Sequence, residues 1–497
     1  MPQPPDRFAT AHFQSDLKGN TVRGGIATFG AQGFSFVLSI ASVAILARLL
    51  TPQDFGLIAM VTAVTGLLAM FKDAGLSMAT VQQDTVTHEQ VSTLFWVNVG
   101  LSVLLMLIVA AMSPWIATFY QEPKLQPITL ALASLFLFDG LSVQHQALLR
   151  RQMQFGVLAK IQILSHVVGI VAAVIAALSG LGYWALIAQT AAAQFVNLCF
   201  TWVFTRWMPG RPRHGVGTRN MLKFGGYLTG FSLVNYFARN ADKVLIGNAW
   251  GGSSLGLYTK AYGLLLMPIQ QINGPITAVA IPALSRLQND PEQFRAFFIK
   301  ILSIICFATF PIIAWMIVCR KELILIFLGH QWEDVIPIFA VLAFSALFQP
   351  IGNITGSLYI ALGRTKRMFK WGLMSSAVIV MSFMIGLPYG PLGVAWAYSG
   401  AITLIIYPLI LYATKETCIR LIDFYTAIKI PLPAMLLSAA VGYGINQMAN
   451  KTDQLILSLL LTSIAMCMMY LLSIYLLDSS MFLQVRNIFI RKNVRTI

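Results

Sequence analysis

Long apolar runs separated by short polar turns make up almost the whole chain. A helix needs roughly 20 apolar residues to cross about 30 Å of hydrocarbon, and runs of this length recur from end to end. We place predicted spans at residues 24–47, 56–80, 92–118, 127–149, 158–178, 182–205, 221–249, 254–285, 295–319, 335–361, 368–387, 391–413, 431–449 and 454–477. The pattern predicts an all-α polytopic membrane protein with about 14 transmembrane helices.

The chain also repeats itself at an offset of 200 residues. The matched pairs are Gly25 with Gly225, Gly30 with Gly230, Ala41 with Ala241, Gly56 with Gly256, and Leu57 with Leu257. Two pseudo-symmetric lobes of six helices fit this repeat, an N-lobe at 24–205 and a C-lobe at 221–413, with a linker at 206–220. Because six is even, both lobes enter the membrane from the same side, as parallel repeats do in transporters.

The remaining segments flank the two lobes. Residues 1–23 form a polar N-terminal segment, 431–477 an extra transmembrane hairpin, and 478–497 a basic tail. Between the C-lobe and the hairpin, residues 414–430 are short and charged but hold several apolar side chains. This segment is either an ordinary connector or an amphipathic helix lying in the membrane interface.

Basic residues gather on one predicted side of the membrane. Of the 34 Lys and Arg residues, 25 fall on the side of the two termini, 5 on the other side and 4 within spans. Short cytoplasmic loops carry such an excess, so we expect both termini in the cytoplasm.

Composition agrees with a membrane protein. The chain is 57% hydrophobic and 10% charged, whereas soluble proteins are about 25% charged. The net charge of +16 follows from basic residues in short loops, so we expect no nucleic-acid partner.

The sequence lacks the usual signatures of an enzyme. It has no Gly-rich phosphate loop with Lys and Ser/Thr, no His-Glu-x-x-His and no Cys-x-x-Cys. The five cysteines are scattered, and the loops on the extracytoplasmic side are short. We therefore expect no catalytic residue, no metal site and no cofactor.

Charged residues inside apolar spans are the candidate functional groups, because ionisable groups at membrane depth are costly and mark transport paths. Arg239, Asp242 and Lys243 are spaced i, i+3, i+4 and share one helical face. The full set comprises the cations Arg48, Lys72, Arg239, Lys243 and Lys260 and the anions Asp73, Asp139 and Asp242. The excess of cations favours an anionic ligand such as a phosphate group.

Simpler interpretations remain open for these residues. Lys72–Asp73 and Arg239–Asp242 are candidates for local ion pairs. The remaining cations are candidates for side chains that extend along the span to place their charge at the membrane interface. Asp139 is a candidate for a proton or sodium site, although no second carboxylate is near it in sequence. The aromatic residues at span ends are predicted to anchor the chain in the membrane interface; they are Trp115, Tyr120, Trp207 and Trp332.

Several motifs resemble the polysaccharide transporter family. They are Ala47-Arg48-Leu49-Leu50-Thr51-Pro52-Gln53-Asp54-Phe55-Gly56, Asp73-Ala74-Gly75-Leu76, Asn240-Ala241-Asp242-Lys243-Val244-Leu245-Ile246-Gly247, Leu255-Gly256-Leu257-Tyr258 and Pro282-Ala283-Leu284-Ser285-Arg286-Leu287-Gln288. This family is a branch of the multidrug/oligosaccharidyl-lipid/polysaccharide (MOP) exporters, and the likeness is to Wzx-type flippases for lipopolysaccharide, O-antigen or colanic acid. The resemblance covers roughly residues 20–415.

The resemblance implies a MATE-like fold with two helix bundles in a V around a central cavity. It implies translocation of an undecaprenyl-diphosphate-linked oligosaccharide across the bacterial inner membrane, for lipopolysaccharide or exopolysaccharide synthesis. The resemblance also implies membrane lipids, polysaccharide polymerases and chain-length regulators as partners. Arg48, Asp73, Asp242, Lys243 and Tyr258 stand at motif positions.

Our hypothesis from the sequence is a flippase for a lipid-linked oligosaccharide that works by alternating access, coupled or not to H⁺ or Na⁺. Arg239, Lys243 and Lys260 would bind the diphosphate, with Lys72 contributing from the first lobe. The alternatives are a drug/cation antiporter of the same fold, a membrane polymerase or glycosyltransferase, and a non-transporting scaffold.

Overall fold

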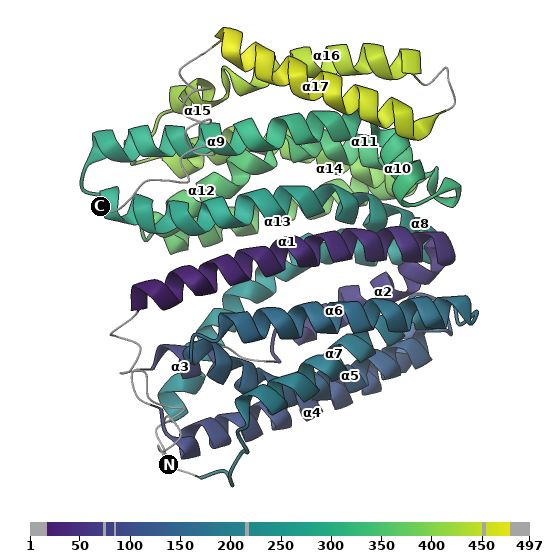
Figure 1. The fold of residues 1–497 in the computed structure, drawn as a ribbon, viewed down its shortest axis with the longest axis vertical. Coiled ribbons are helices and arrows are strands. Elements are labelled where there is room, and N and C mark those ends of the chain that lie inside the picture. The colour runs from purple at the N-terminus through teal and green to yellow at the C-terminus, as the bar shows by residue number, and fades with distance from the viewer. Residues whose placement is uncertain (1–16, 73–75, 84–85, 214–217, 450–453, 478–497) are drawn as a thin grey trace. The chain divides into compact units, whose positions relative to one another are not determined.

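The computed structural model describes residues 17–72, 76–83, 86–213, 218–449 and 454–477, drawn as ribbons in Figure 1. Every regular element in these ranges is a helix, so the predicted all-α class is confirmed. The chain divides into two compact units, residues 1–256 and 257–497. The boundaries of the two predicted six-helix lobes stay a prediction.

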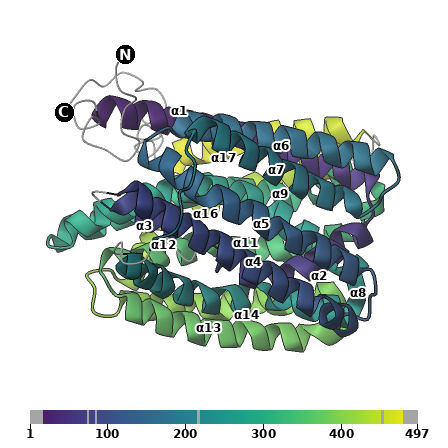
Figure 2. The same ribbon diagram turned by 90° about the horizontal axis from the view of Figure 1, so that it is seen from below.

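The first unit contains seven complete helices and the first part of an eighth. They are α1 (Leu17–Leu49), α2 (Pro52–Ala69), α3 (Leu76–Gln82), α4 (His88–Phe119), α5 (Leu125–Arg151), α6 (Phe155–Leu178), α7 (Trp184–Thr205) and α8 (Thr218–Leu287). The helix α8 begins in the first unit and ends in the second. Within the first unit, α4, α5, α6 and α7 lie along one another (Figure 2).

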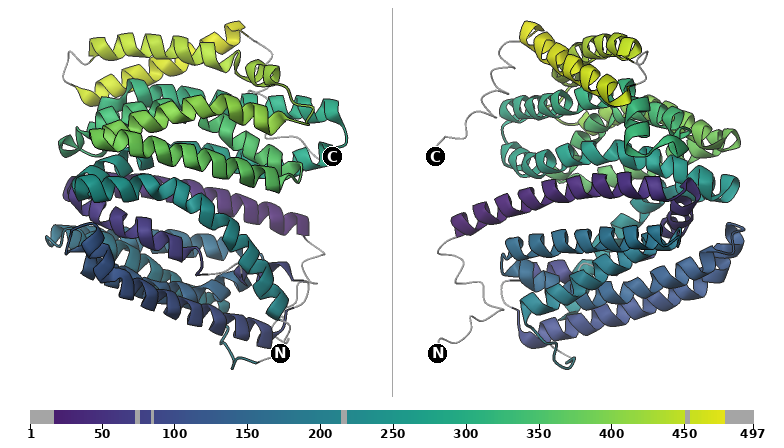
Figure 3. Two further views of the ribbon diagram at one scale, coloured as in Figure 1. Left: turned by 180° about the vertical axis from the view of Figure 1, so that it is seen from behind. Right: turned by 45° about the vertical axis from the view of Figure 1, so that its right-hand side comes forward.

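The second unit is also built from helices. After the end of α8 come α9 (Pro291–Val318), α10 (Arg320–Phe327), η2 (His330–Trp332), α11 (Val335–Ala346), α12 (Gln349–Ala361), α13 (Thr365–Gly386), η3 (Leu387–Tyr389), α14 (Gly390–Thr414), α15 (Leu421–Ile428), α16 (Pro431–Ala449) and α17 (Leu455–Leu477). The last two helices form a pair, coloured yellow-green and yellow in Figure 3.

The described residues contain 11 helices that are long and apolar enough to cross a membrane, or 12 if the bent pair α11–α12 is one span. The chain is therefore a multi-pass membrane protein, while the count of fourteen spans stays a prediction. Two of the candidate spans are interrupted by glycines with positive φ angles, Gly251 (φ 74°) inside α8 and Gly390 (φ 75°) at the first position of α14. Both glycines lie where the sequence predicts a turn between spans, since glycine adopts such angles without strain.

The predicted continuous span at 56–80 is wrong. The helix α2 ends at Ala69, and α3 begins only at Leu76. Past the end of α2, the N–H groups of Met70, Phe71 and Lys72 donate to carbonyls three residues back, the tighter pattern that closes many helix ends. Lys72 therefore lies at a break in the helix and not inside it.

The predicted continuous span at 335–361 is also interrupted. The helices α11 and α12 meet at an angle of 42° around Leu347 and Phe348. Pro350 stands in the first turn of α12, and proline has no N–H to continue the ladder of an incoming helix. The bend therefore has a cause that is visible in the sequence.

The aromatic residues at span ends have two different roles. Trp115 is 56% exposed, as an interfacial anchor requires. Tyr120, Trp207 and Trp332 are instead buried against protein, so the prediction that they anchor the chain in the interface is wrong. The rings of Trp207 and His145 pack edge to face in the first unit, with centroids 5.1 Å apart.

The start of α2 is defined by its own sequence. Thr51 caps the helix and exchanges hydrogen bonds with Asp54, whose carboxylate accepts from the backbone N–H of Thr51 at 2.9 Å. Pro52 occupies the first helical position, where its missing N–H costs nothing. The motif Thr-Pro-Gln-Asp is thus a complete helix-start signal.

Directly after this cap, α2 crosses α8 with the two backbones in contact. A Cβ atom on Gly56 would overlap the carbonyl oxygen of Gly252, and one on Gly256 would overlap that of Pro52. The two contacts are related by the sequence offset of 200. Gly56 contacts Gly252, and their counterparts across the offset, Gly256 and Pro52, also contact each other. Glycine is required at both positions because any side chain would push the helices apart.

We predict that Gly56→Ala and Gly256→Ala each destabilise the protein. The added methyl groups cannot be accommodated without moving a backbone, which costs about 1–3 kcal/mol or more. The matched control is Gly100→Ala in α4, where a Cβ meets no atom within 4 Å and helix propensity favours alanine by about 1 kcal/mol. Thermal unfolding of the purified proteins measures the difference, and equal midpoints for Gly56→Ala and Gly100→Ala would contradict the close crossing.

Candidate functional site

An ion pair joins the end of α2 to the middle of α5. The ammonium of Lys72 lies 2.9 Å from the carboxylate of Asp139, and the two side chains are 37% and 25% exposed. The residues are 67 positions apart in sequence. Lys72 therefore forms an ion pair with a residue of another helix. Asp139, the candidate proton or sodium site, has this lysine as its partner in the structure. Asp73 lies outside the described residues.

A row of polar groups continues along α5 beyond Asp139. The amide oxygen of Gln144 accepts from the hydroxyl of Thr80 at 2.9 Å, and the guanidinium of Arg151 donates to the carbonyl oxygen of Thr80 at 3.1 Å. His145 is fully buried and its Nδ1 lies 2.7 Å from the hydroxyl of Thr205. This row ties α3, α5 and α7 together.

The middle of α8 carries a second set of polar contacts. The ammonium of Lys243 donates to the amide oxygen of Asn240 at 2.9 Å, and Asn240 donates to the backbone carbonyl of Tyr236 at 3.0 Å. The hydroxyl of Tyr236 donates to carbonyl oxygens of α2, at 3.0 Å to Thr62 and 3.1 Å to Ala63. Gly66 leaves the space for this hydroxyl, since a Cβ there would overlap it.

Lys243 differs from Lys72 in the partner that it holds. Among the described residues, the recorded contact of the Lys243 ammonium is to a neutral amide, with no carboxylate within ion-pair distance. Its side chain is half-buried. The recorded partner of Lys243 is therefore neutral, whereas that of Lys72 is a carboxylate.

Asp242 and Arg239 share the predicted face of α8 with Lys243. Asp242 is 4% exposed, and its carboxylate accepts from the backbone N–H of Lys243 at 2.8 Å. Arg239 lies in α8, but its side chain is outside the described part of the structure, so the predicted Arg239–Asp242 pair stays a prediction.

Two more predicted site residues lie elsewhere. Arg48 stands in the last turn of α1 and is exposed. Lys260 belongs to the second unit, half-buried on α8, and Tyr258 in the same unit is 1% exposed. Tyr258 stacks on Tyr262, with ring centroids 6.3 Å apart and nearly parallel planes.

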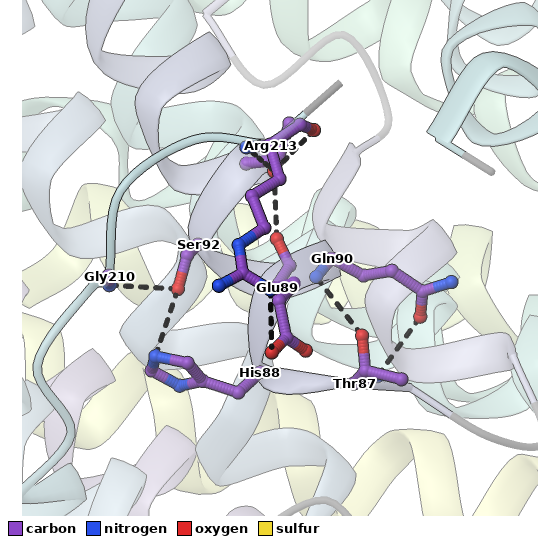
Figure 4. A network of polar contacts seen from close by, with 8 residues as sticks. Thr87, His88, Glu89, Gln90, Ser92, Gly210 and Arg213 are labelled. Atoms are coloured by element: carbon purple, nitrogen blue, oxygen red, sulfur yellow. Dashed lines mark hydrogen bonds and ion pairs between the residues drawn. The ribbon is translucent and has the colours of Figure 1, made fainter. Parts of the chain in front are cut away.

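A network at the start of α4 holds the first residues of the predicted linker (Figure 4). The backbone N–H of Gly210 donates to the hydroxyl of Ser92 at 2.9 Å, and Arg213 lies 3.7 Å from the carboxylate of Glu89. The indole N–H of Trp207 donates to Nδ1 of His88 at 3.0 Å. These contacts fix residues 207–213 to α4.

Reasoning from the sequence missed the neutral polar residues in these contacts, Asn240, Tyr236 and Gln144. Neutral polar residues are common within spans and do not by themselves indicate a site. The available signal is the concentration of polar residues in α5, which holds Asp139, Ser142, Gln144, His145 and Gln146 within eight positions.

Comparison with protein families gives a match over much of the chain. The model of a family described as polysaccharide biosynthesis protein matches residues 45–337. The lipopolysaccharide biosynthesis protein WzxC of Escherichia coli (strain K12) is 26% identical over 355 residues, 70% of this chain and 71% of WzxC. The teichuronic acid biosynthesis protein TuaB of Bacillus subtilis (strain 168) is 28% identical over 366 residues, 73% of this chain and 76% of TuaB.

Solved structures share the fold. The lipid II flippase MurJ in an inward closed conformation superposes with a TM-score of 0.73 at 16% identity, covering 93% of this chain and 99% of MurJ. An inward-facing multidrug resistance MATE transporter of the MOP superfamily gives a TM-score of 0.59 at 14% identity, covering 79% and 95% of the two chains. The predicted MATE-like MOP fold is therefore confirmed.

We predict that Lys72 and Asp139 stabilise each other. Lys72→Ala or Asp139→Ala alone leaves one charge without its partner, whereas the double variant removes both charges, so the two losses are not additive. We expect a coupling of about 1 kcal/mol, because both side chains are partly exposed. Thermal unfolding measures it, with the exposed Lys124→Ala as control. Additive losses would show that the pair contributes nothing.

Proposed function

The chain belongs to the family of polysaccharide biosynthesis proteins, and on this premise we propose that it is a flippase for a lipid-linked oligosaccharide. It acts as a transporter and not as an enzyme. Its relatives by sequence are named for the synthesis or transport of surface polysaccharides, among them the succinoglycan biosynthesis transport protein ExoT of Rhizobium meliloti (strain 1021). MurJ, which shares the fold, is named as a lipid II flippase.

The observation that carries the proposal is the environment of Lys243. A flippase must bring a diphosphate and a polar glycan through hydrocarbon while the polyprenyl tail stays in lipid. A half-buried ammonium that holds a neutral amide can exchange that amide for a phosphate oxygen, because charge-assisted hydrogen bonds are the stronger kind. Lys243 is thus suited to bind the headgroup.

The other charged residues take different parts in this proposal. Arg239, on the same predicted face of α8, is a further candidate ligand of the diphosphate, and the sequence predicts the same role for Lys260. Lys72, which holds Asp139 at 2.9 Å, becomes a ligand only when the substrate displaces that carboxylate. The carboxylate of Asp242 accepts a hydrogen bond from the backbone N–H of Lys243 and helps to fix the backbone at this position.

The finer assignments follow from the same proposal. The substrate is an undecaprenyl-diphosphate-linked oligosaccharide, and the membrane is the bacterial inner membrane with both termini in the cytoplasm. The distribution of Lys and Arg between the two sides supports this orientation. A polysaccharide polymerase and a chain-length regulator are the partners that would receive the product.

We predict that Lys243→Ala slows flipping strongly while the protein still inserts and folds. Purified protein is reconstituted in liposomes with a fluorescent polyprenyl-diphosphate oligosaccharide, and the access of an external quencher is followed over time. Losing one phosphate ligand costs about 1.5–3 kcal/mol for a hydrogen bond to a charged group, which slows flipping by more than tenfold. Lys243→Arg retains the charge and keeps part of the rate.

The matched control is Lys124→Ala, which removes an exposed lysine next to α5. It is expected to flip at the unaltered rate. If Lys243→Ala flips as fast as Lys124→Ala, the headgroup assignment is wrong. If the unaltered protein flips no faster than empty liposomes but exports a cationic dye under a proton gradient, it is an antiporter instead.

A further inference from the structure

A carboxylate without any exposed surface lies in the second unit, between α10 and the C-terminal helix pair. Glu322 stands in the first turn of α10 and is 0% exposed. Its Oε1 accepts from the amide of Asn446 on α16 at 2.8 Å and from the hydroxyl of Ser458 on α17 at 3.5 Å. Three helices distant in sequence therefore converge on one carboxylate.

Two buried polar atoms on these helices are satisfied by no described group. The second oxygen of Glu322, Oε2, has no hydrogen-bond partner among the described residues, and neither has the hydroxyl of Thr462. Thr462 is 0% exposed and follows Ser458, which contacts Glu322, by one helical turn, so both hydroxyls lie on one face of α17. Buried polar atoms in proteins are normally paired, so the unpaired carboxylate oxygen and the unpaired hydroxyl favour a bound ligand.

The helices around Glu322 offer no counter-charge. The helices α11, α16 and α17 contain no Asp, Glu, Lys, Arg or His, and the charged residues of α9 (Glu292, Arg295 and Lys300) are all in its first ten positions, at the end remote from α10.

The ionisable groups nearest in sequence are engaged elsewhere. The guanidinium of Arg320 donates to the carbonyl oxygen of Ile317 at 2.8 Å, and Lys321 is exposed. His330 and Glu333 pair with each other at 3.2 Å, with side chains 81% and 61% exposed. Cys319, which precedes α10, is buried. Lys451 and Asp453 lie outside the described residues.

A buried carboxylate that is hydrogen-bonded only to neutral donors is unfavourable, because the free-energy cost of its desolvation exceeds the stabilisation from those hydrogen bonds. One bound positive charge would compensate for this cost. Carboxylate, hydroxyl and amide oxygens are the ligands that hard cations prefer, and a proton on Oε2 neutralises the group equally. We propose that Glu322 binds one monovalent cation at Oε2, either Na⁺ or a proton. The hydroxyls of Ser458 and Thr462 complete the sodium site, and the amide N–H of Asn446 holds Oε1 in place.

The site joins the C-terminal helix pair to the rest of the second unit. Elsewhere the pair is attached through neutral contacts, from Trp315 on α9 to Ser463 at 2.8 Å and from Tyr470 to the carbonyl oxygen of Phe307 at 2.9 Å. Occupancy of the site therefore controls how firmly α16 and α17 pack on α10. Its use as a coupling site, driven by an ion gradient, rests on the proposed flippase function, but cation binding itself does not.

The experiment measures thermal unfolding of the purified full-length protein without substrate. The protein is heated in sodium chloride and in choline chloride at equal ionic strength, over a series of pH values. If Na⁺ is the ligand, Tm rises saturably by a few degrees in sodium only, because a ligand of the folded state stabilises it. If the ligand is a proton, Tm rises as the pH is lowered and the choice of salt has no effect.

Three variants assign the effect to this site. Glu322→Gln is neutral and nearly isosteric, and is expected to fold and lose both responses. Thr462→Val keeps the shape and removes the hydroxyl, so it weakens the sodium response and leaves a proton response intact. The exposed Glu333→Gln is the matched control and keeps the behaviour of the unaltered protein.

The proposal is overturned if the unaltered protein responds to neither sodium nor pH, or if Glu322→Gln responds as the unaltered protein does. Neither result depends on transport. A protein that binds the cation but does not flip the lipid-linked oligosaccharide would contradict only the proposed function.

Discussion

The contact between the backbones of α2 and α8 is the constraint on which the arrangement of the first unit depends. Gly56 and Gly256 bring the start of α2 against α8 at Gly252, with no side chain between them. This close approach allows the hydroxyl of Tyr236 to reach the carbonyl oxygens of Thr62 and Ala63 further along α2. Tyr236 in turn lies one helical turn before Asn240, the residue that holds Lys243.

Local signals in the sequence predict the helices better than the contacts between them. The cap of Thr51, Pro52 and Asp54 fixes the start of α2, and Gly251 marks the turn inside α8. The end of α2 at Ala69 was missed because hydropathy continues through Phe71, while the charge of Lys72 is satisfied by a residue 67 positions away. Such a pairing depends on how α2 and α5 pack, which no local pattern encodes.

The resemblance motifs divide into residues that serve folding and residues suited to bind a ligand. Thr51, Asp54, Gly56 and Gly256 build a cap and a crossing. Lys243, at a motif position in the same family, instead donates to a neutral amide, and we propose it as a ligand of the headgroup. The family match alone does not separate these roles, whereas the partner of each side chain does.

The burial of Glu322 ties the C-terminal helix pair to an earlier part of the chain. The family match stops at residue 337, so Glu322 lies inside it, whereas Asn446 and Ser458, which donate to its carboxylate, lie outside. A chain that ended after α15 would leave this carboxylate without either donor. The helix pair therefore cannot be removed without cost, and a truncated chain would call for an apolar or neutral residue at position 322.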